Sequence, residues 1–158
     1  NLIKTFLKLQ VKNKKLIIAG NVLNKNYFNE IYTENKNIQF VNRFIENDEL
    51  QYFYKAADVV VLPFNKVKNS GSAIMAMGFK KPIIAPKMGV LKNRLKKQEF
   101  LMYDSLDSGL KNALQLSRND LEEIGKQNFL ALQNNKWEDY IKCFINNNNS
   151  VYTYSKNC

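Results

Sequence analysis

Short apolar runs alternate with amphipathic segments along most of the chain. Continuous apolar runs predict strands at 15–19, 38–44, 59–62, 82–85 and 99–103. Apolar residues at helical spacing predict helices at 1–10, 26–35, 49–57, 70–79, 108–116, 120–133 and 137–146. Asn47 or Asp48 is expected to cap the third helix, and Ser117 or Asn119 the sixth. This alternation favours an α/β fold with one mainly parallel sheet and helices on both faces.

The segment from strand 59–62 to the next helix carries the strongest functional signal. The strand is apolar throughout, as expected of a strand buried on both faces of a parallel sheet. The loop that leaves it ends in Asn69, Ser70, Gly71 and Ser72, at the start of a helix. In open α/β sheets ligands bind beyond the carboxyl ends of the strands, and helix N-terminal amides attract phosphates. The sequence therefore favours a phosphate site here.

Two interpretations of this segment stay open. Gly71 allows a ligand close to the backbone, and Lys66 and Lys68 on the loop could neutralise a phosphate. Alternatively, Ser70 or Ser72 is a plain helix cap and both lysines are solvated. On local grounds alone the plain cap is favoured.

Composition bounds the protein's class. The chain has 158 residues, 45% of them hydrophobic, which is enough for one domain with a core. We expect this domain at 1–146 and a polar tail at 147–158. Cys143 and Cys158 fit no metal-binding pattern. We therefore expect a reduced, cytoplasmic protein without a metal site. The chain has no histidine, which excludes histidine-based acid–base chemistry within it.

The net charge of +10 points to an acidic partner or to solubilising lysines. Nucleic acid, an anionic membrane and a phosphorylated small molecule all qualify as partners. The basic residues cluster at Lys92, Arg94, Lys96 and Lys97, without interleaved aromatic residues. That composition disfavours nucleic acid. A solvated face is the first interpretation of the cluster and an anionic lipid surface the second.

Six segments together resemble one enzyme family. They are 16–20 (LIIAG), 40–44 (FVNRF), 47–54 (NDELQYFY), 56–63 (AADVVVLP), 78–85 (GFKKPIIA) and 137–138 (WE). In this order they resemble the C-terminal, donor-binding half of retaining GT-B glycosyltransferases of family 4, also called group 1. The resemblance covers residues 1–144. It implies a Rossmann-like domain, the C-terminal half of a GT-B fold.

The resemblance implies a donor site but leaves the catalytic residues unidentified. The family's usual pair of glutamates, eight positions apart, would fall on Val67 and Met75, so no carboxylate role carries over. The segment that includes Ser70 is instead similar to a subgroup with Thr-Ser-Gly-Ser at the helix start. The resemblance thus implies that backbone N–H groups around Gly71 hold the donor diphosphate, at Asn69, Ser70, Gly71 and Ser72.

The resemblance also places the nucleotide base or ribose beside the ends of two earlier strands. The residues there are Gly20, Asn21, Arg43 and Phe44. The alternatives are a solvated arginine at a strand end and a turn at Gly20 that serves only the backbone. Both interpretations are held open.

The function implied by the resemblance is a hexosyltransferase-type glycosyltransferase. Its donor would be a nucleotide-diphosphate sugar and its acceptor a growing cell-surface polysaccharide or other glycan. No cofactor or metal is implied, and the expected location is the cytoplasm, peripheral to the inner face of the membrane. The family's first strand, its Gly-Arg…Lys loop and its N-terminal acceptor-binding domain have no counterpart before Asn1. The chain is therefore expected to be a fragment that is inactive on its own.

Two alternatives come from other functional classes. One is a non-catalytic α/β ligand-binding or regulatory module. A receiver-like module would need acidic residues at the strand ends, which carry Gly20, Phe44, Pro63 and Pro86 instead. The other alternative is a basic nucleic-acid-binding domain.

Overall fold

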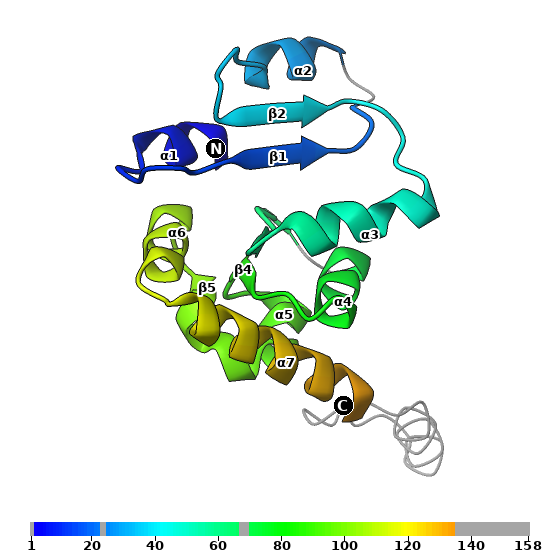
Figure 1. Cartoon of the computed structure of the whole chain (residues 1–158), viewed down its shortest axis with the longest axis vertical. Helices are drawn as coiled ribbons and strands as arrows, with labels where there is room; N and C mark the ends of the chain where they lie inside the picture. The colour runs from blue at the N-terminus through cyan, green and yellow to red at the C-terminus, as the bar shows by residue number, and fades with distance from the viewer. Residues whose placement is uncertain (1, 23–24, 67–69, 135–158) are drawn as a thin grey trace, which may run out of the picture.

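The computed structural model describes residues 2–22, 25–66 and 70–134, and Figure 1 shows their arrangement. The elements follow one another as α1 (Leu2–Lys8), β1 (Leu16–Ala19), α2 (Lys25–Ile31), β2 (Ile38–Val41), α3 (Asn47–Ala56), β3 (Val60–Val61), α4 (Gly71–Gly78), β4 (Ile83–Pro86), α5 (Gly89–Arg94), the 3-10 helix η1 (Lys96–Leu101), β5 (Met102–Tyr103), α6 (Leu106–Leu114) and α7 (Arg118–Asn134).

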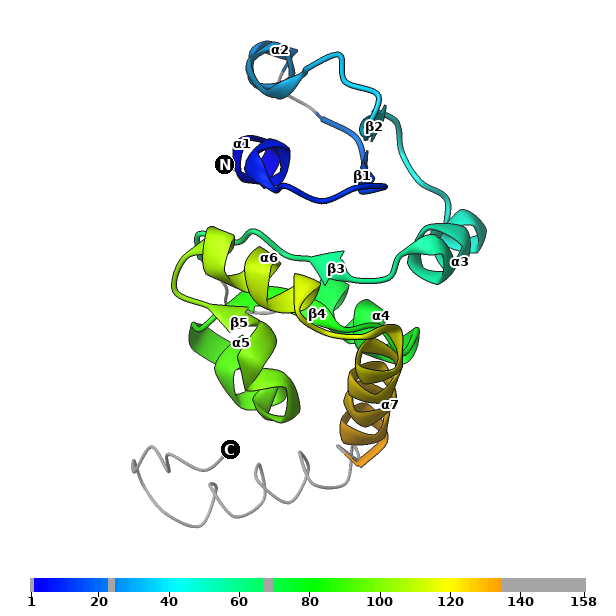
Figure 2. The ribbon, with the colours of Figure 1, turned by 60° about the vertical axis from the view of Figure 1, so that its left-hand side comes forward.

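All strand pairs are parallel, which confirms the predicted α/β class. The strands differ from the expectation in forming two sheets instead of one. One sheet pairs β1 with β2, and the other has the order β3-β4-β5. Figures 1 and 2 show the first sheet with α1 and α2, and the second with α4, α5, α6 and α7 around it.

Strand β4 is buried along its whole length. Its side chains alternate between two cores, as a strand requires. Ile83 and Ala85 pack with residues of α4, including Ala76 and Met77, and Ile84 packs with Leu110 of α6. Helices therefore cover both faces of the second sheet.

The strand expected at 59–62 is present as β3, but its expected burial on both faces is wrong. Of its residues only Leu62 is buried, and Val59, Val60 and Val61 are half-buried. The reason is that β3 pairs with β4 on one side only, so its other edge remains open within the described chain. Apolar content alone does not tell an edge strand from a central one.

A buried glutamine anchors the start of β4. Gln98 of η1 is 2% exposed, and its side-chain amide pairs with the backbone of Ile83. The Ile83 N–H donates to Gln98 Oε1 (3.0 Å), and Gln98 Nε2 donates to the Ile83 carbonyl (2.7 Å). Asn128 of α7 donates to the same Oε1 (2.8 Å) and to the Lys81 carbonyl (3.0 Å). This network joins η1, β4 and α7 and leaves none of these amide groups without a partner.

Helix α7 lies directly on the turn between α4 and β4. A Cβ atom built on Gly125 would sit 1.9 Å from the carbonyl oxygen of Lys80. Only glycine allows this approach. Lys80 itself has a φ of 56°, so the turn is already in an uncommon conformation for a residue with a side chain.

The first sheet has its own small core. Ile3 and Phe6 of α1 and Ile38 of β2 are buried together. The ring of Phe40 on β2 packs with those of Phe28 and Tyr32, and the centroids of the three rings lie 5.2–5.7 Å apart.

A lysine holds the end of α1. Lys14 Nζ donates to the carbonyls of Phe6 (2.7 Å), Leu9 (2.5 Å) and Leu7 (3.3 Å), and lies 4.8 Å from the Phe6 ring centroid. An ammonium group at a helix C-terminus is favourable, because the free carbonyls there are partly negative.

Several element boundaries differ from the prediction. Helix α5 and η1 were not expected; η1 occupies most of the predicted strand 99–103, of which only Met102–Tyr103 is extended. Glu46 caps α3, in place of Asn47 or Asp48. Ser117 caps α7 as predicted, since its Oγ accepts from the Asp120 N–H (3.2 Å). The predicted helix 137–146, with Cys143, and the tail 147–158 lie outside the described residues.

We expect Gly125→Ala to destabilise the protein by about 2–3 kcal/mol, because the new methyl group would overlap backbone that cannot move aside. Gly78→Ala is the matched control. It also places a methyl group on a helix, but the nearest atom is Leu132 Cδ2 at 4.0 Å. Urea denaturation of the two variants measures both effects. Equal midpoints for the two variants would contradict the close packing of α7.

Candidate functional site

The start of α4 is fixed by a buried serine cap. Ser70 is 3% exposed, and its Oγ accepts a hydrogen bond from the Ala73 N–H (3.1 Å). The capping interpretation of Ser70 is thus confirmed, since its Oγ already accepts a hydrogen bond within the first turn of α4. A side chain held in this way gives the first helical turn a fixed direction.

The next two residues at this helix start are exposed. Gly71 and Ser72 are exposed, and a Cβ built on Gly71 would meet nothing within 4 Å. Within the described chain, neither backbone N–H has a hydrogen-bond acceptor. The first turn carries no acidic side chain. The arrangement can accept an anion, because the helix start is partly positive and no described residue beyond its chain neighbours lies within 4 Å of a Cβ built on Gly71.

The loop before α4 leaves a tightly held strand end. The Leu62 N–H donates to the Ile84 carbonyl (2.9 Å), and the Leu62 carbonyl accepts from the Tyr103 hydroxyl (3.4 Å). Burial raises the pKa of that Tyr103 hydroxyl above its ordinary value. Lys66 on the loop is exposed.

Three residues that the sequence analysis named on or near this loop are not described. Asn69, Val67 and Lys68 lie outside the described residues. Met75, the second position of the family's glutamate pair, is 38% exposed on α4.

The ends of β1 and β2 are joined by backbone and side-chain hydrogen bonds. Gly20 has a φ of 142°, a conformation that residues with side chains rarely adopt, and its N–H donates to the Val41 carbonyl (3.1 Å). The Val22 N–H donates to Asn42 Oδ1 (3.0 Å). Asn21, between them, is exposed. The glycine turn therefore serves the backbone and also leaves Asn21 open to a ligand.

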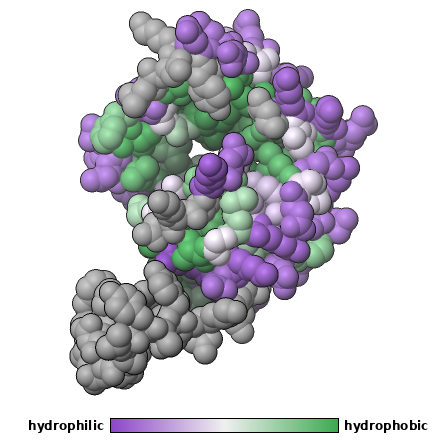
Figure 3. Space-filling model, turned by 180° about the vertical axis from the view of Figure 1, so that it is seen from behind, coloured by the Kyte–Doolittle hydropathy of each residue, from purple (hydrophilic) through white to green (hydrophobic). Residues whose placement is uncertain are grey.

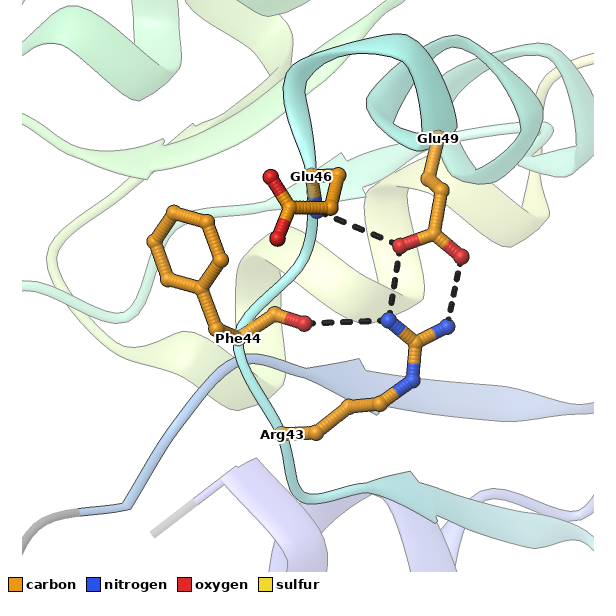
Figure 4. Close-up of polar contacts among 4 residues, drawn as sticks. All are labelled: Arg43, Phe44, Glu46 and Glu49. Carbon is orange, nitrogen blue, oxygen red and sulfur yellow. Dashed lines mark hydrogen bonds and ion pairs between the residues drawn. The ribbon is translucent and has the colours of Figure 1, made fainter.

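Arg43 is engaged by a carboxylate, as Figure 4 shows. Its Nη1 and Nη2 donate to Glu49 Oε2 (2.6 Å) and Oε1 (2.7 Å), and Nη1 also donates to the Phe44 carbonyl (3.0 Å). Glu49 Oε2 accepts in addition from the Glu46 N–H (3.2 Å), which completes a capping box at the start of α3. Arg43 is therefore exposed, with 52% of its side chain accessible, as the solvated-arginine interpretation expects, and it also holds the entry to a helix.

The same contacts shift the titration of the pair. The hydrogen bonds from Arg43, and then that from the Glu46 backbone, lower the pKa of Glu49 from 4.5 to about 2. The bond to Glu49 raises the pKa of Arg43. Sequence reasoning missed Glu49, although the spacing Glu46-x-x-Glu49 resembles a capping box that begins with an acid.

Phe44 leaves this turn with its ring exposed. The residue is 65% exposed, and its side chain points away from the Arg43–Glu49 pair (Figure 4). An exposed aromatic ring can stack on a planar ligand.

The two groups of candidate residues lie on different sheets. Among the described residues, no hydrogen bond or ion pair joins the start of α4 to the ends of β1 and β2. Helix α3 connects them, because it begins at the Arg43–Glu49 pair and its Tyr54 stacks on Phe79 at the end of α4, with centroids 5.0 Å apart and planes 7° apart.

The basic cluster is only partly described. Lys92 is exposed, and Arg94 is half-buried; its Nη1 is buried and has no hydrogen-bond partner among the described residues. Nothing in the placement of Lys92 and Arg94 marks a ligand. Within the described residues there is neither a cluster of three potential metal-binding side chains nor a helix apolar and long enough to cross a membrane.

Comparison with known proteins gives one match. A family model described as "Glycosyl transferases group 1" matches residues 1–119, which run from α1 into the start of α7. No curated protein matches the chain. No solved structure matches it either.

The Glu49 carboxyl should titrate with a midpoint near pH 2 when followed by carbon NMR. Because its pKa is lowered in the folded state, the pair stabilises the protein above pH 4.5, and this contribution is lost as the pH falls from 4.5 toward 2. Arg43→Gln should return the midpoint toward 4.5 and remove this pH dependence.

Arg118→Gln is the control for that titration, since it removes an exposed pair with Glu122 (3.3 Å) far from α3. It should leave the Glu49 midpoint unchanged. A Glu49 midpoint near 4.5 in the unmodified protein would show that the pair does not form in solution.

Proposed function

Since the chain belongs to the group 1 glycosyl transferases, we propose that it is the part of such an enzyme that binds the sugar donor, a nucleoside-diphosphate sugar. The observation that carries the proposal is the open helix start at Gly71 and Ser72, which lies inside the matched region. The sugar, of hexose type, passes to a growing surface polysaccharide or another glycan.

The donor diphosphate lies against the first turn of α4 in this proposal. The backbone N–H groups of Gly71 and Ser72, both exposed residues, donate to phosphate oxygens, while Ser70 holds the turn in place. We assign Asn69, which lies outside the described residues, to the same site from the sequence alone. As the bond to the sugar breaks, negative charge grows on the departing diphosphate. Amides that already point at that position stabilise it without reorganising.

The base and ribose extend from there toward the ends of β1 and β2. Phe44, after the end of β2, offers its exposed ring to the base, and Gly20 and Asn21 follow the end of the paired strand β1. Arg43 acts indirectly, because its pair with Glu49 holds the segment that carries Phe44. In this proposal Arg43 is a positioning residue for that segment.

The acceptor is bound elsewhere in the same enzyme. In this proposal the acceptor-binding domain is a separate part of the polypeptide, so residues 1–158 bind donor but transfer no sugar alone. The net charge of +10 supports an acidic partner. We assign that role first to the donor phosphates and second to anionic lipid at the inner, cytoplasmic face of the membrane.

The test of this proposal is a titration with UDP and GDP followed by amide NMR. The amides of Gly71, Ser72 and Ala73 should shift, with a Kd near 1 mM, because a few charge-assisted hydrogen bonds supply most of the affinity. Uridine carries the base without phosphate. It should shift Phe44 and Asn21 and leave the α4 amides where they are.

Gly71→Val should weaken UDP or GDP binding about tenfold or more, because its side chain occupies the space in front of the amides. Ser72→Ala is the matched control. It keeps the amide and removes only an exposed hydroxyl, so affinity should stay within about twofold. Ser70→Ala removes the cap and should cost about 1 kcal/mol of stability with a smaller loss of affinity than Gly71→Val.

Two outcomes count against the proposal in different ways. If amide signals elsewhere shift at saturating nucleotide while those of α4 do not, the diphosphate site is misplaced. No shift anywhere with any nucleotide would contradict donor binding by this domain.

A further inference from the structure

The segment that forms α1 and β1 is basic throughout. Residues 1–29 include six lysines and no aspartate or glutamate, although the whole chain has 14 acidic residues. The first acidic residues are Glu30 and Glu34, on α2 and just after it. A run of charges of one sign produces a positive local potential, which attracts an anionic partner.

Five exposed lysines form what we call the basic edge, namely Lys4, Lys8, Lys12, Lys15 and Lys36. Among the described residues, none of them lies within ion-pair distance of a carboxylate. Lys4 and Lys8 are one turn apart on α1, a spacing at which like charges repel each other. An anionic surface outside the chain would relieve this repulsion.

The fold gathers these lysines at the amino ends of β1 and β2. Figure 1 shows α1 running antiparallel to β1, so its last turn, with Lys8, lies at the start of that strand. The Leu16 N–H donates to the Asn37 carbonyl (2.8 Å), which brings the chain at Lys15 next to the chain at Lys36. Seen from behind, the side of the molecule that carries α1 is bordered mainly by hydrophilic residues (Figure 3).

Lys14 has a structural role and is not part of the basic edge. Its ammonium group donates to the last carbonyls of α1, at Phe6 and Leu9. These hydrogen bonds fix the turn that carries Lys12 and Lys15, so the two exposed lysines are held on one side of the sheet.

The basic edge is separate from the candidate donor site. Phe44 follows the carboxyl end of β2 and the Gly71 turn follows that of β3, whereas Lys15 and Lys36 precede the amino ends of β1 and β2. In open α/β sheets ligands bind at the carboxyl ends of the strands. The donor phosphates therefore do not account for the charge of the basic edge.

Two exposed apolar side chains lie among these lysines. Leu7 is 39% exposed and Val11 is 38% exposed. Residues 2–16 contain no arginine, and their one aromatic residue, Phe6, is buried. Nucleic acid is recognised mainly by arginine and by stacking on exposed aromatic rings. Lysines interspersed with aliphatic side chains suit an anionic lipid surface better, since the ammonium groups meet headgroup phosphates and the aliphatic groups enter the interface.

We propose that the basic edge docks on an anionic lipid bilayer, with Leu7 and Val11 at the level of the headgroups. This docking places the lipid contact named in the proposed function and rests on that function in this respect alone, because donor binding does not depend on it. With the amino ends of β1 and β2 on the bilayer, the donor site at the opposite strand ends faces away from the lipid.

The first experiment is flotation of the chain with lipid vesicles. With vesicles of about 30% phosphatidylglycerol in phosphatidylcholine, the protein should bind at about 50 mM NaCl. Binding should fall about tenfold or more at about 300 mM NaCl, because salt screens exposed charges. Vesicles of phosphatidylcholine alone should bind none of it.

Two charge-matched double variants test the surface. Lys8→Glu/Lys12→Glu changes the basic edge, and Lys92→Glu/Lys126→Glu changes exposed lysines on α5 and α7. Each variant lowers the net charge from +10 to +6. The first should lose binding by about twentyfold or more, since each lysine near the surface contributes about fivefold. The control should lose less than about threefold, and UDP or GDP binding should be the same in both variants.

A second measurement uses the unmodified chain, so it does not depend on the folding of a variant. Anionic bicelles that carry a spin-labelled lipid headgroup should broaden the amide signals of residues 7–15 and of Lys36. The amides of Gly71 and Ser72 should stay sharp.

Four results would overturn the proposal. The first is no flotation with anionic vesicles at low salt, and the second is an equal loss of binding in the two double variants. The third is broadening by the spin label that is strongest away from residues 7–15. The fourth is displacement of the protein from vesicles by a single-stranded oligonucleotide that shifts the same amides, since the edge would then be a nucleic-acid surface.

Discussion

The side chain of Gln98 pairs with the backbone of Ile83 as a neighbouring strand would, and Asn128 donates to the same oxygen. This places a fully satisfied polar network inside an apolar core, at the point where β4 begins. Leaving any one of these buried groups unpaired would cost about 1–3 kcal/mol. The seat of α4 and the contact of α7 with the Lys80 turn both depend on the strand that this network anchors.

The candidate site follows from that arrangement. Helix α4 lies on β4 through Ala76 and Met77, so its first turn has a fixed position and direction. The other half of the site rests on the first sheet, where the Arg43–Glu49 pair fixes how the chain enters α3.

The sequence predicts the class of the fold and the position of the candidate site better than it predicts the environment of single residues. Apolar runs locate β1, β2 and β4, and the Ser-Gly-Ser turn locates the start of α4, because these are local signals. The predicted burial of β3 was wrong, because the pairing of strands depends on residues far apart in the sequence. Helix α5 and η1 were not predicted, because each has only six residues and so shows little helical periodicity. The Gln98 network and the Arg43–Glu49 pair join residues whose partners cannot be read from spacing, apart from the capping box. The donor contacts of Gly20, Asn21, Arg43, Phe44 and the α4 turn stay predictions.

The most direct test of this account is native-state hydrogen exchange of the unmodified chain and of Gln98→Met. We expect the amides of Ile83 and Ile84 to exchange slowest in the unmodified protein, at the rate of global unfolding, and those of β1 to exchange faster. In Gln98→Met, protection of β4 and of the α4 amides should fall together. If β4 exchanges as fast as β1, or if α4 keeps its protection when β4 loses it, then the buried network does not hold the candidate site in place.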